Sequence, residues 1–247
     1  MPRAYRPYAS TVSFGPGPLS PAIKGLIIAN VVVFLLSGFS RTIFSAFGLV
    51  PVLFLSDLRL WTPFTYMFLH AGLFHILFNM LALWMFGTEF ERMWGTRYFL
   101  KYYLTTGVGA GLLTVLFSLL PFGFAQQVYV SNIVGASGAI YGLLLAYALY
   151  FPDRPIYMYF LFAVPAKYFV LIIGVIAFYS SLGSGSGIAN ATHLGGLVVG
   201  YIMLRGTRIN PLSEVRYRYL KWRMNNARKK FGVYRGGRSD DYDRRVH

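Results

Sequence analysis

Residues 102–151 read YYLTTGVGAGLLTVLFSLLPFGFAQQVYVSNIVGASGAIYGLLLAYALYF, fifty consecutive positions without one charged side chain. An α-helix needs about 20 mostly apolar residues to cross the hydrocarbon core of a bilayer. This stretch is therefore long enough for two crossings with a turn between them. Residues that favour turns occupy its middle: Pro121, Gly123, Gln126, Gln127, Ser131 and Asn132. They divide it into helices predicted over 98–120 and 137–151, of which the second is short for a full crossing.

The composition of the whole chain fits a membrane protein and excludes two other classes. Of the 247 residues, 56% are hydrophobic and only 13% are charged, although the formal net charge is +15. A soluble nucleic-acid-binding protein would share the net charge but carry about 25% charged residues. A disordered protein would lack the aromatic and aliphatic content. The chain has no cysteine, which excludes disulfides, thiolate metal sites and a cysteine nucleophile.

Further apolar runs complete six predicted spans, so the expected fold is all-α: a polytopic membrane protein with a six-transmembrane-helix bundle. The spans cover residues 22–39, 72–89, 98–120, 137–151, 166–182 and 188–204, within a membrane domain over 22–205. Residues 40–69 are rich in aromatic side chains and are expected to form a structured interfacial loop with short helices. Residues 152–165 are expected to lie partly in the interface. Residues 123–132 and 183–187 are predicted loops that could admit water.

The charges lie mainly outside these spans and predict the orientation. The connections after the second and fourth spans carry Arg92, Arg97 and Arg154, whereas those after the third and fifth carry no charge. The positive-inside rule then places both termini in the cytoplasm. We expect a multi-pass protein of a bacterial plasma membrane. Residues 1–21 are predicted to be a disordered cytoplasmic segment without the pattern of a cleaved signal peptide.

A basic cytoplasmic tail is predicted over residues 206–247, and its role has more than one interpretation. Residues 205–247 hold 13 of the 23 basic residues and 4 of the 8 acidic ones. Asn210 and Pro211 fit a helix start, and apolar residues follow at helical spacing. The tail is either a solvated extension that fixes the topology or a partly amphipathic helix on anionic lipid. No nucleic acid is expected as a partner, because no DNA- or RNA-binding motif accompanies the charge.

Polar side chains inside predicted spans are costly in hydrocarbon and therefore mark function. The candidates are His70, His75, Asn79, Ser137 and His193. At about 1.5 Å per helical residue, counted from the nearest cytoplasmic charge, His75 lies about 21 Å deep, Ser137 about 24 Å and His193 about 18 Å. Three helices thus deliver a hydroxyl and two imidazoles to one layer. His70 is expected to be structural, joining the first loop to the second span.

A serine hydroxyl and two imidazoles at one depth predict acyl-transfer chemistry. Ser137 is the expected nucleophile and His193 the expected general base. The acidic residues lie in loops, at the interface or in the tail, so the pair would be a dyad rather than a triad. His75 and Asn79 share one helix face at a spacing of four residues. Together with the backbone N–H of Ser137 at a helix N-terminus, they would stabilise the oxyanion.

Glycine pairs predict that the helices carrying Ser137 and His193 approach closely. Gly138 and Gly142 form one GxxxG pattern, and Gly196 and Gly200 form another. Such patterns allow two helix backbones to come into contact. A serine on one helix could then reach a histidine on the other.

Each of these polar residues, taken alone, also fits a purely structural role. Ser137 could be a small packing residue, and His75, Asn79 and His193 could form interhelical hydrogen bonds. Two other functions remain open: a transporter whose histidines relay protons, and a catalytically silent chaperone that binds transmembrane helices. A transporter should show internal repeats, and none is obvious here. The shared depth of the candidates favours the hydrolase.

At these residues the sequence resembles the rhomboid family of intramembrane serine proteases. His70, His75 and Asn79 match the HxxxxHxxxN pattern of the second helix. Residues 135–138 match the GxSG nucleophile motif, and His193 with Gly196 and Gly200 matches the HxxGxxxG of the sixth helix. Tyr141 matches the tyrosine that stacks on the catalytic histidine in this family, and Glu91 with Gly95 resembles its ExxxG motif. The resemblance covers nearly all of residues 20–205.

The resemblance implies a function, and the sequence departs from the family pattern at one position. Family members cut single-pass membrane proteins near the outer end of the spanning helix, after a small residue, without a metal or cofactor. The implied partners are therefore transmembrane-helix substrates and the lipid bilayer, with lateral access beside the second and fifth spans. Where the family usually has Trp-Arg in the first loop, this chain has Trp61 and Thr62. The family's arginine is structural, so this change bears on loop stability and not on catalysis.

Overall fold

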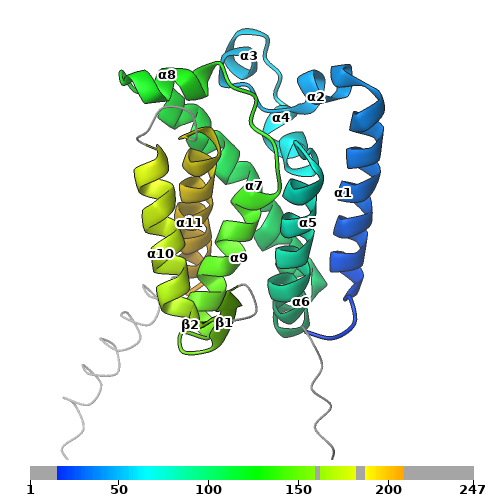
Figure 1. The fold of residues 1–247 in the computed structure, drawn as a ribbon, viewed down its shortest axis with the longest axis vertical. Helices are drawn as coiled ribbons and strands as arrows, with labels where there is room; N and C mark the ends of the chain where they lie inside the picture. The colour runs from blue at the N-terminus through cyan, green and yellow to red at the C-terminus, as the bar shows by residue number, and fades with distance from the viewer. Residues whose placement is uncertain (1–15, 159–161, 182–186, 209–247) are drawn as a thin grey trace, which may run out of the picture. The chain divides into compact units, whose positions relative to one another are not determined.

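The computed structural model describes residues 16–158, 162–181 and 187–208. Its main helices run side by side as a bundle (Figure 1), which confirms the predicted helical membrane fold. They are α1 (Pro21–Phe39), α5 (Leu73–Ala82) continued by α6 (Thr88–Trp94), α7 (Thr96–Ser118), α9 (Ser137–Tyr150), α10 (Ala166–Ser181) and α11 (Gly187–Arg208). A π-helical turn, η2 (Leu83–Gly87), joins α5 to α6.

Helix length and composition agree with a membrane location. Within the part of the chain that the structure describes, three helical stretches are long and apolar enough to cross a bilayer: Pro21–Phe39, Leu73–Trp94 and Thr96–Ser118. The helices α9 and α10 are apolar but shorter, as predicted for the fourth span. In α9, 9 of 14 residues are buried, whereas in α1 only 3 of 19 are. Thus α9 is the central helix and α1 is peripheral, with an exposed apolar surface suited to lipid.

The helix α9 packs closely against α7 at Gly142. The Tyr102 hydroxyl donates a hydrogen bond of 2.8 Å to the Gly142 carbonyl oxygen. A Cβ atom on Gly142 would overlap the side chain of Thr106 on α7. The absence of a side chain at Gly142 therefore lets the two backbones lie close together.

The start of α1 is fastened by the carboxylate of Glu91 on α6. This side chain is 4% exposed and accepts hydrogen bonds from the Ser20 hydroxyl and the backbone N–H groups of Ala22 and Ile23. Thr96 donates a further bond of 2.7 Å. A carboxylate at a helix N-terminus satisfies N–H groups that lack helical partners and interacts favourably with the helix dipole.

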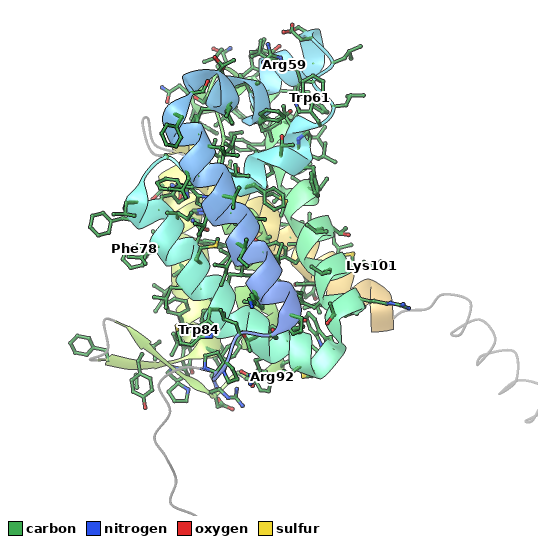
Figure 2. The ribbon with its side chains drawn as sticks, turned by 90° about the vertical axis from the view of Figure 1, so that its right-hand side faces the viewer. Arg59, Trp61, Phe78, Trp84, Arg92 and Lys101 are labelled. Carbon is green, nitrogen blue, oxygen red and sulfur yellow. The ribbon has the colours of Figure 1, made fainter. Side chains whose placement is uncertain are left out.

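The segment before α1 also contacts η2 and α6. Arg92 donates to the carbonyl oxygens of Pro16 at 2.6 Å and Pro18 at 2.9 Å, and the Trp84 indole donates to Gly17 at 3.1 Å. Trp84 and Arg92 lie together near one end of the molecule (Figure 2). Residues 16–20, which the sequence placed in a disordered segment, are therefore held against the bundle. Residues 1–15 and the predicted tail helix lie outside the described residues.

The first loop is structured, as expected, and occupies the opposite end (Figures 1 and 2). It contains α2 (Arg41–Phe47), α3 (Pro51–Ser56), α4 (Thr62–Thr65) and the 3₁₀ turn η1 (Tyr66–Phe68). The Trp61 indole donates to Ala46 at 2.9 Å, and Arg59 donates to Ser45 at 3.2 Å. Thr62 is buried and donates to the Arg59 carbonyl at 2.8 Å. Thr62 thus has a satisfied hydroxyl where the family usually has arginine.

Two connections differ from the prediction. The predicted loop over residues 123–132 begins with a helix, α8 (Gly123–Tyr129). The connection after α9 contains an antiparallel pair of strands, β1 (Pro155–Met158) and β2 (Phe162–Pro165), in a fold expected to be all-α. The strands are short and apolar, so periodicity does not separate them from the end of a span. The turn-favouring residues of 123–132 predicted a loop, but tertiary contacts can outweigh such local propensity.

Candidate active site

The candidate nucleophile lies at the first residue of a helix that starts inside the bundle. Ser137 opens α9, and Figure 1 shows α9 beginning further from the α8 end of the molecule than its neighbours α10 and α11. Gly135 has φ of +120°, a conformation that other residues rarely adopt. This turn brings the chain into the helix, and the first N–H groups of α9 have no helical partner.

The hydroxyl of Ser137 meets the imidazole of His193 on α11. The distance between Ser137 Oγ and His193 Nε2 is 2.8 Å, a hydrogen bond. The two helices touch at their backbones, because a Cβ atom on Gly196 would overlap the carbonyl oxygen of Gly138. A Cβ atom on Gly200 would lie 3.0 Å from Gly142 Cα. All four glycines of the two predicted patterns thus lie where α9 and α11 make close contact.

The imidazole of His193 is oriented by stacking. Its ring lies parallel to that of Tyr141, with 4.1 Å between centroids and 7° between planes. Its Nδ1 atom is buried without a hydrogen-bond partner among the described residues. If Nε2 accepts from Ser137, a neutral ring carries its proton on Nδ1. The described part of the chain supplies no carboxylate to that nitrogen, and the dyad stays a prediction.

The imidazole of His75 lies on the other side of the turn before Ser137. A Cβ atom on Gly135 would be 2.7 Å from His75 Nε2 and 3.7 Å from Ser137 Oγ. The backbone N–H of Ala71 donates to His75 Nδ1 at 3.3 Å. A neutral ring that accepts at Nδ1 carries its proton on Nε2. His75 therefore presents an N–H donor beside the nucleophile.

Asn79 lies one turn further along α5 and is 7% exposed. One of its amide protons goes to the His75 carbonyl oxygen, at 2.8 Å. An amide NH₂ has two protons, so one donor remains. Asn79 also lines the cavity that contains Ser137. The side chain can therefore offer a hydrogen bond to a group bound there.

These residues share one cavity of about 500 Å³ with a mainly apolar lining. The lining residues are Phe74, His75, Phe78, Asn79, Ala82, Ser137, Ile140, Tyr141, Leu144 and His193. They come from α5, α9 and α11. Phe78 is 64% exposed and points away from the bundle (Figure 2). The cavity thus joins polar groups at its base to an apolar rim on α5.

The first loop holds the segment that leads to the nucleophile, a connection the sequence did not reveal. Leu49 and Ile133 pair as an isolated antiparallel bridge, with N–H to O distances of 3.0 and 2.8 Å. The Gly135 N–H donates to the Tyr66 carbonyl at 2.9 Å. Asn132 donates to the Phe44 carbonyl at 3.1 Å. Three contacts from distant parts of the loop thus fix residues 132–135.

Two further contacts near the site were also missed. A Cβ atom on Gly195 would lie 3.0 Å from the Ala110 carbonyl oxygen on α7. The hydroxyl groups of Thr114 on α7 and Thr192 on α11 are hydrogen-bonded to each other at 3.0 Å. They fix α11 against α7 beside His193. The adjacent glycines Gly195 and Gly196 could have predicted this contact. They leave two sides of α11 without side chains, so that one side can pack on α7 and the other on α9.

His70 is buried, with 2% exposed surface, and its ring contacts that of His75 edge to face at 5.0 Å. It lies between the first loop and α5, the place expected for a structural residue. Unlike His75, it does not line the cavity that contains Ser137. Among the described residues no group of three His, Asp or Glu side chains could hold a metal ion.

Comparisons with known proteins identify the family of this chain. A family model described as the Rhomboid domain matches residues 57–208. The Rhomboid protease GluP of Bacillus subtilis is 34% identical over 156 residues, which cover 63% of this chain and 28% of that protein. The Rhomboid protease GlpG of Pectobacterium atrosepticum is 30% identical over 201 residues, which cover 79% and 65%.

A eukaryotic relative extends the comparison. The mitochondrial Rhomboid protein 1 of Saccharomyces cerevisiae is 34% identical over 138 residues, covering 55% of this chain and 38% of that protein. The chain thus spans between 28% and 65% of the length of these three relatives. The match over 57–208 includes every polar candidate from His70 to His193, and the apolar helices make the chain an integral membrane protein. The chain belongs to the rhomboid family.

Proposed function

We propose that this chain is an intramembrane serine endopeptidase that hydrolyses peptide bonds in or near transmembrane helices. The observation that carries the proposal is the hydrogen bond of 2.8 Å between Ser137 Oγ and His193 Nε2 in the cavity between α5, α9 and α11. Its relatives GluP and GlpG are named as proteases. A serine hydroxyl is a weak nucleophile until a base accepts its proton, and this imidazole is placed to accept it.

Acylation follows from this pair. Ser137 Oγ attacks the carbonyl carbon of the scissile bond while its proton moves to His193 Nε2. The C–N bond then breaks, and His193 gives the proton to the leaving amine, so the acyl group remains on Ser137. Stacking on Tyr141 holds the ring in line during both transfers. In a triad a carboxylate orients the histidine. In this dyad the stacking on Tyr141 orients the ring instead.

The oxyanion of the tetrahedral intermediate is stabilised by donors that converge beside Ser137. They are His75 Nε2–H, the free amide proton of Asn79 and the backbone N–H of Ser137. The N–H group at the start of α9 also adds the positive end of the helix dipole. Loss of one oxyanion donor typically lowers kcat by about 10²–10³. We assign these groups as auxiliary residues and Ser137 and His193 as the catalytic pair.

Deacylation repeats the chemistry with water. His193 accepts a proton from the water, whose oxygen attacks the acyl carbon, and then returns the proton to Ser137 Oγ as the acid product leaves. The polar groups around Ser137 offer a place for this water in an otherwise apolar region. No step needs a metal or a cofactor.

The substrate class follows from the position of the site. A spanning helix reaching Ser137 from the lipid would pass the apolar rim formed by Phe74 and Phe78 on α5. We propose that the substrate helix enters from the lipid between α5 and α10. No described residue of α10 lines the cavity itself. The substrate must unwind locally, because helical peptide bonds are shielded. We place the protein in a bacterial plasma membrane. The distribution of Arg and Lys favours both termini in the cytoplasm.

The test is cleavage of a model transmembrane substrate in liposomes. Ser137→Ala and His193→Ala should each abolish cleavage, and a fluorophosphonate should label the wild type but not Ser137→Ala. Ser45→Ala, which alters an exposed hydroxyl in the first loop, is the control and should cleave normally. Cleavage that persists in Ser137→Ala would refute the assignment. Binding of the substrate without cleavage by the wild type would instead support a chaperone.

A further inference from the structure

The connection between α9 and α10 is an apolar hairpin that the proposed mechanism does not use. Its strands pair from Pro155 opposite Pro165 to Met158 opposite Phe162. Residues 155–166 carry no charge, whereas the residues on either side, 154 and 167, are an arginine and a lysine. Figure 2 shows the hairpin projecting sideways from one end of the bundle. Its direction is across the helices rather than along them.

Only part of the hairpin is covered by protein. Ile156 is 8% exposed and belongs to the core, whereas its neighbour Tyr157 is 61% exposed. Successive side chains of a strand point to opposite faces, so one face packs on the bundle and the other is open. Phe162 opposes Met158 and therefore shares the face of Ile156, but it lies in the last pair before the tip of the hairpin and is 66% exposed. Aromatic rings on an open surface of this kind mark contact with a membrane or another protein.

The helices that precede and follow the hairpin in the chain, α9 and α10, also expose apolar side chains. Leu149 near the end of α9 is 50% exposed, and Leu171 in the first half of α10 is 62% exposed. Tyrosine is enriched where hydrocarbon meets water, because its ring is apolar and its hydroxyl polar. The occupant that fits Tyr157 and Phe162 is therefore the interfacial layer of the same bilayer.

The backbone limits how deep the hairpin can lie. The sheet has two strands, so each strand has an outer edge whose N–H and C=O groups are unpaired within the sheet. Such groups are not tolerated against hydrocarbon. They can bond to water and headgroups, which confines the hairpin to the interface.

The charged residues at the base of the hairpin agree with a position at the membrane interface. Arg154 forms an ion pair with Glu89, and its guanidinium lies 4.2 Å from the centroid of the Phe151 ring. Lys167 Nζ lies 2.7 Å from Asp153. Both cations are partly exposed and can also contact lipid phosphate. We propose that the β1–β2 hairpin is an interfacial anchor that inserts its aromatic side chains among the lipid headgroups at this end of the bundle.

The anchor has a geometric consequence for the proposed nucleophile. The helix α9 runs without interruption from Ser137 to Tyr150, 14 residues, or about 21 Å. Fixing the hairpin at the interface therefore fixes the depth of Ser137. This consequence rests on the proposed function, whereas the anchor itself does not.

Site-directed labelling tests the anchor directly, because the chain contains no cysteine. A nitroxide label is attached to Tyr157→Cys and Phe162→Cys in the full chain reconstituted in liposomes. Accessibility to oxygen and to a water-soluble nickel complex is then measured by power saturation. Leu171→Cys on the surface of α10 is the lipid reference, and Asp153→Cys, whose side chain is 79% exposed, is the polar reference.

We expect labels at 157 and 162 to be more accessible to oxygen and less accessible to nickel than the label at 153, with values closer to the 171 reference. Nickel accessibility equal to that of position 153 would overturn the proposal. Protection that appears only when other membrane proteins are added would also overturn it, in favour of a protein partner. The readout does not involve cleavage, so the anchor and the proposed protease function can fail independently.

Discussion

The carbonyl oxygen of Gly138 occupies the place where a Cβ atom of Gly196 would lie. The helices that carry Ser137 and His193 are therefore in backbone contact one residue after the nucleophile and three residues after the base. The hydrogen bond between the two catalytic candidates depends on this approach, because a side chain between α9 and α11 would separate them.

Gly196→Ala should accordingly reduce both stability and activity. Overpacking typically costs about 1–3 kcal/mol, and a displacement of 1 Å between reacting groups can cost about a hundredfold in rate. Thermal unfolding in detergent and cleavage in liposomes measure the two effects. Gly25→Ala is the matched control, since nothing lies within 4 Å of its Cβ position. Equal activity of the two variants would contradict the packing argument.

Tyr141 should act through its ring and not through its hydroxyl. Tyr141→Phe keeps the stacking on His193 and should retain activity within about twofold, whereas Tyr141→Ala should lower kcat by about tenfold to a hundredfold. Steady-state cleavage separates kcat from KM for both variants. A large loss in Tyr141→Phe would mean that the hydroxyl has a role beyond orienting the ring.

Gly48 and Asn132 should be energetically coupled. A Cβ atom on Gly48 would overlap the Asn132 side chain, so Gly48→Ala should displace residues 132–135 and lower kcat by about tenfold or more. Asn132→Ala removes both the clash and the hydrogen bond to Phe44, and should cost less. The double variant should be no worse than Asn132→Ala alone, which a double-mutant cycle on cleavage rates can measure. Additive losses would show that the two residues act separately.

Glu91 should stabilise the fold without affecting chemistry. Glu91→Gln weakens charge-assisted hydrogen bonds to the start of α1 and should lower the free energy of unfolding by about 1–3 kcal/mol. Glu89→Gln is the control, because its ion pair with Arg154 is partly exposed and such pairs contribute about 1 kcal/mol or less. The cleavage rate per folded molecule should remain that of the wild type for Glu91→Gln. A loss of kcat in the folded fraction would assign Glu91 a further role.

Much of the bundle could be predicted because charge is scarce in this sequence. Uncharged runs defined the spans, and the distance of Ser137, His75 and His193 from the nearest charge indicated a shared depth. The geometry brings these three side chains to one cavity. Sequence spacing works here because a helix has a fixed rise per residue and the bilayer a limited thickness.

The remaining features depend on contacts between distant residues or on weak local signals. The pairing of Leu49 with Ile133 joins positions 84 residues apart, and neither residue has a distinctive neighbourhood in the sequence. Residues 155–165 are apolar throughout, so no alternation distinguishes a strand from the end of a span. The turn-favouring residues of 123–132 do not exclude α8, because tertiary contacts can outweigh local propensity.

The π-helical turn η2 divides the second span into two parts, α5 and α6, that make different contacts. The part before it carries His75 and Asn79 toward the cavity, and the part after it carries Glu91 to the start of α1. Each residue of a helix adds about 100° of rotation, so loss of one residue from this turn would swing one part against the other by that angle. The two parts can therefore rotate independently. Insertions or deletions within Leu83–Gly87 can turn the face that carries His75 and Asn79 while Glu91 stays at the start of α1.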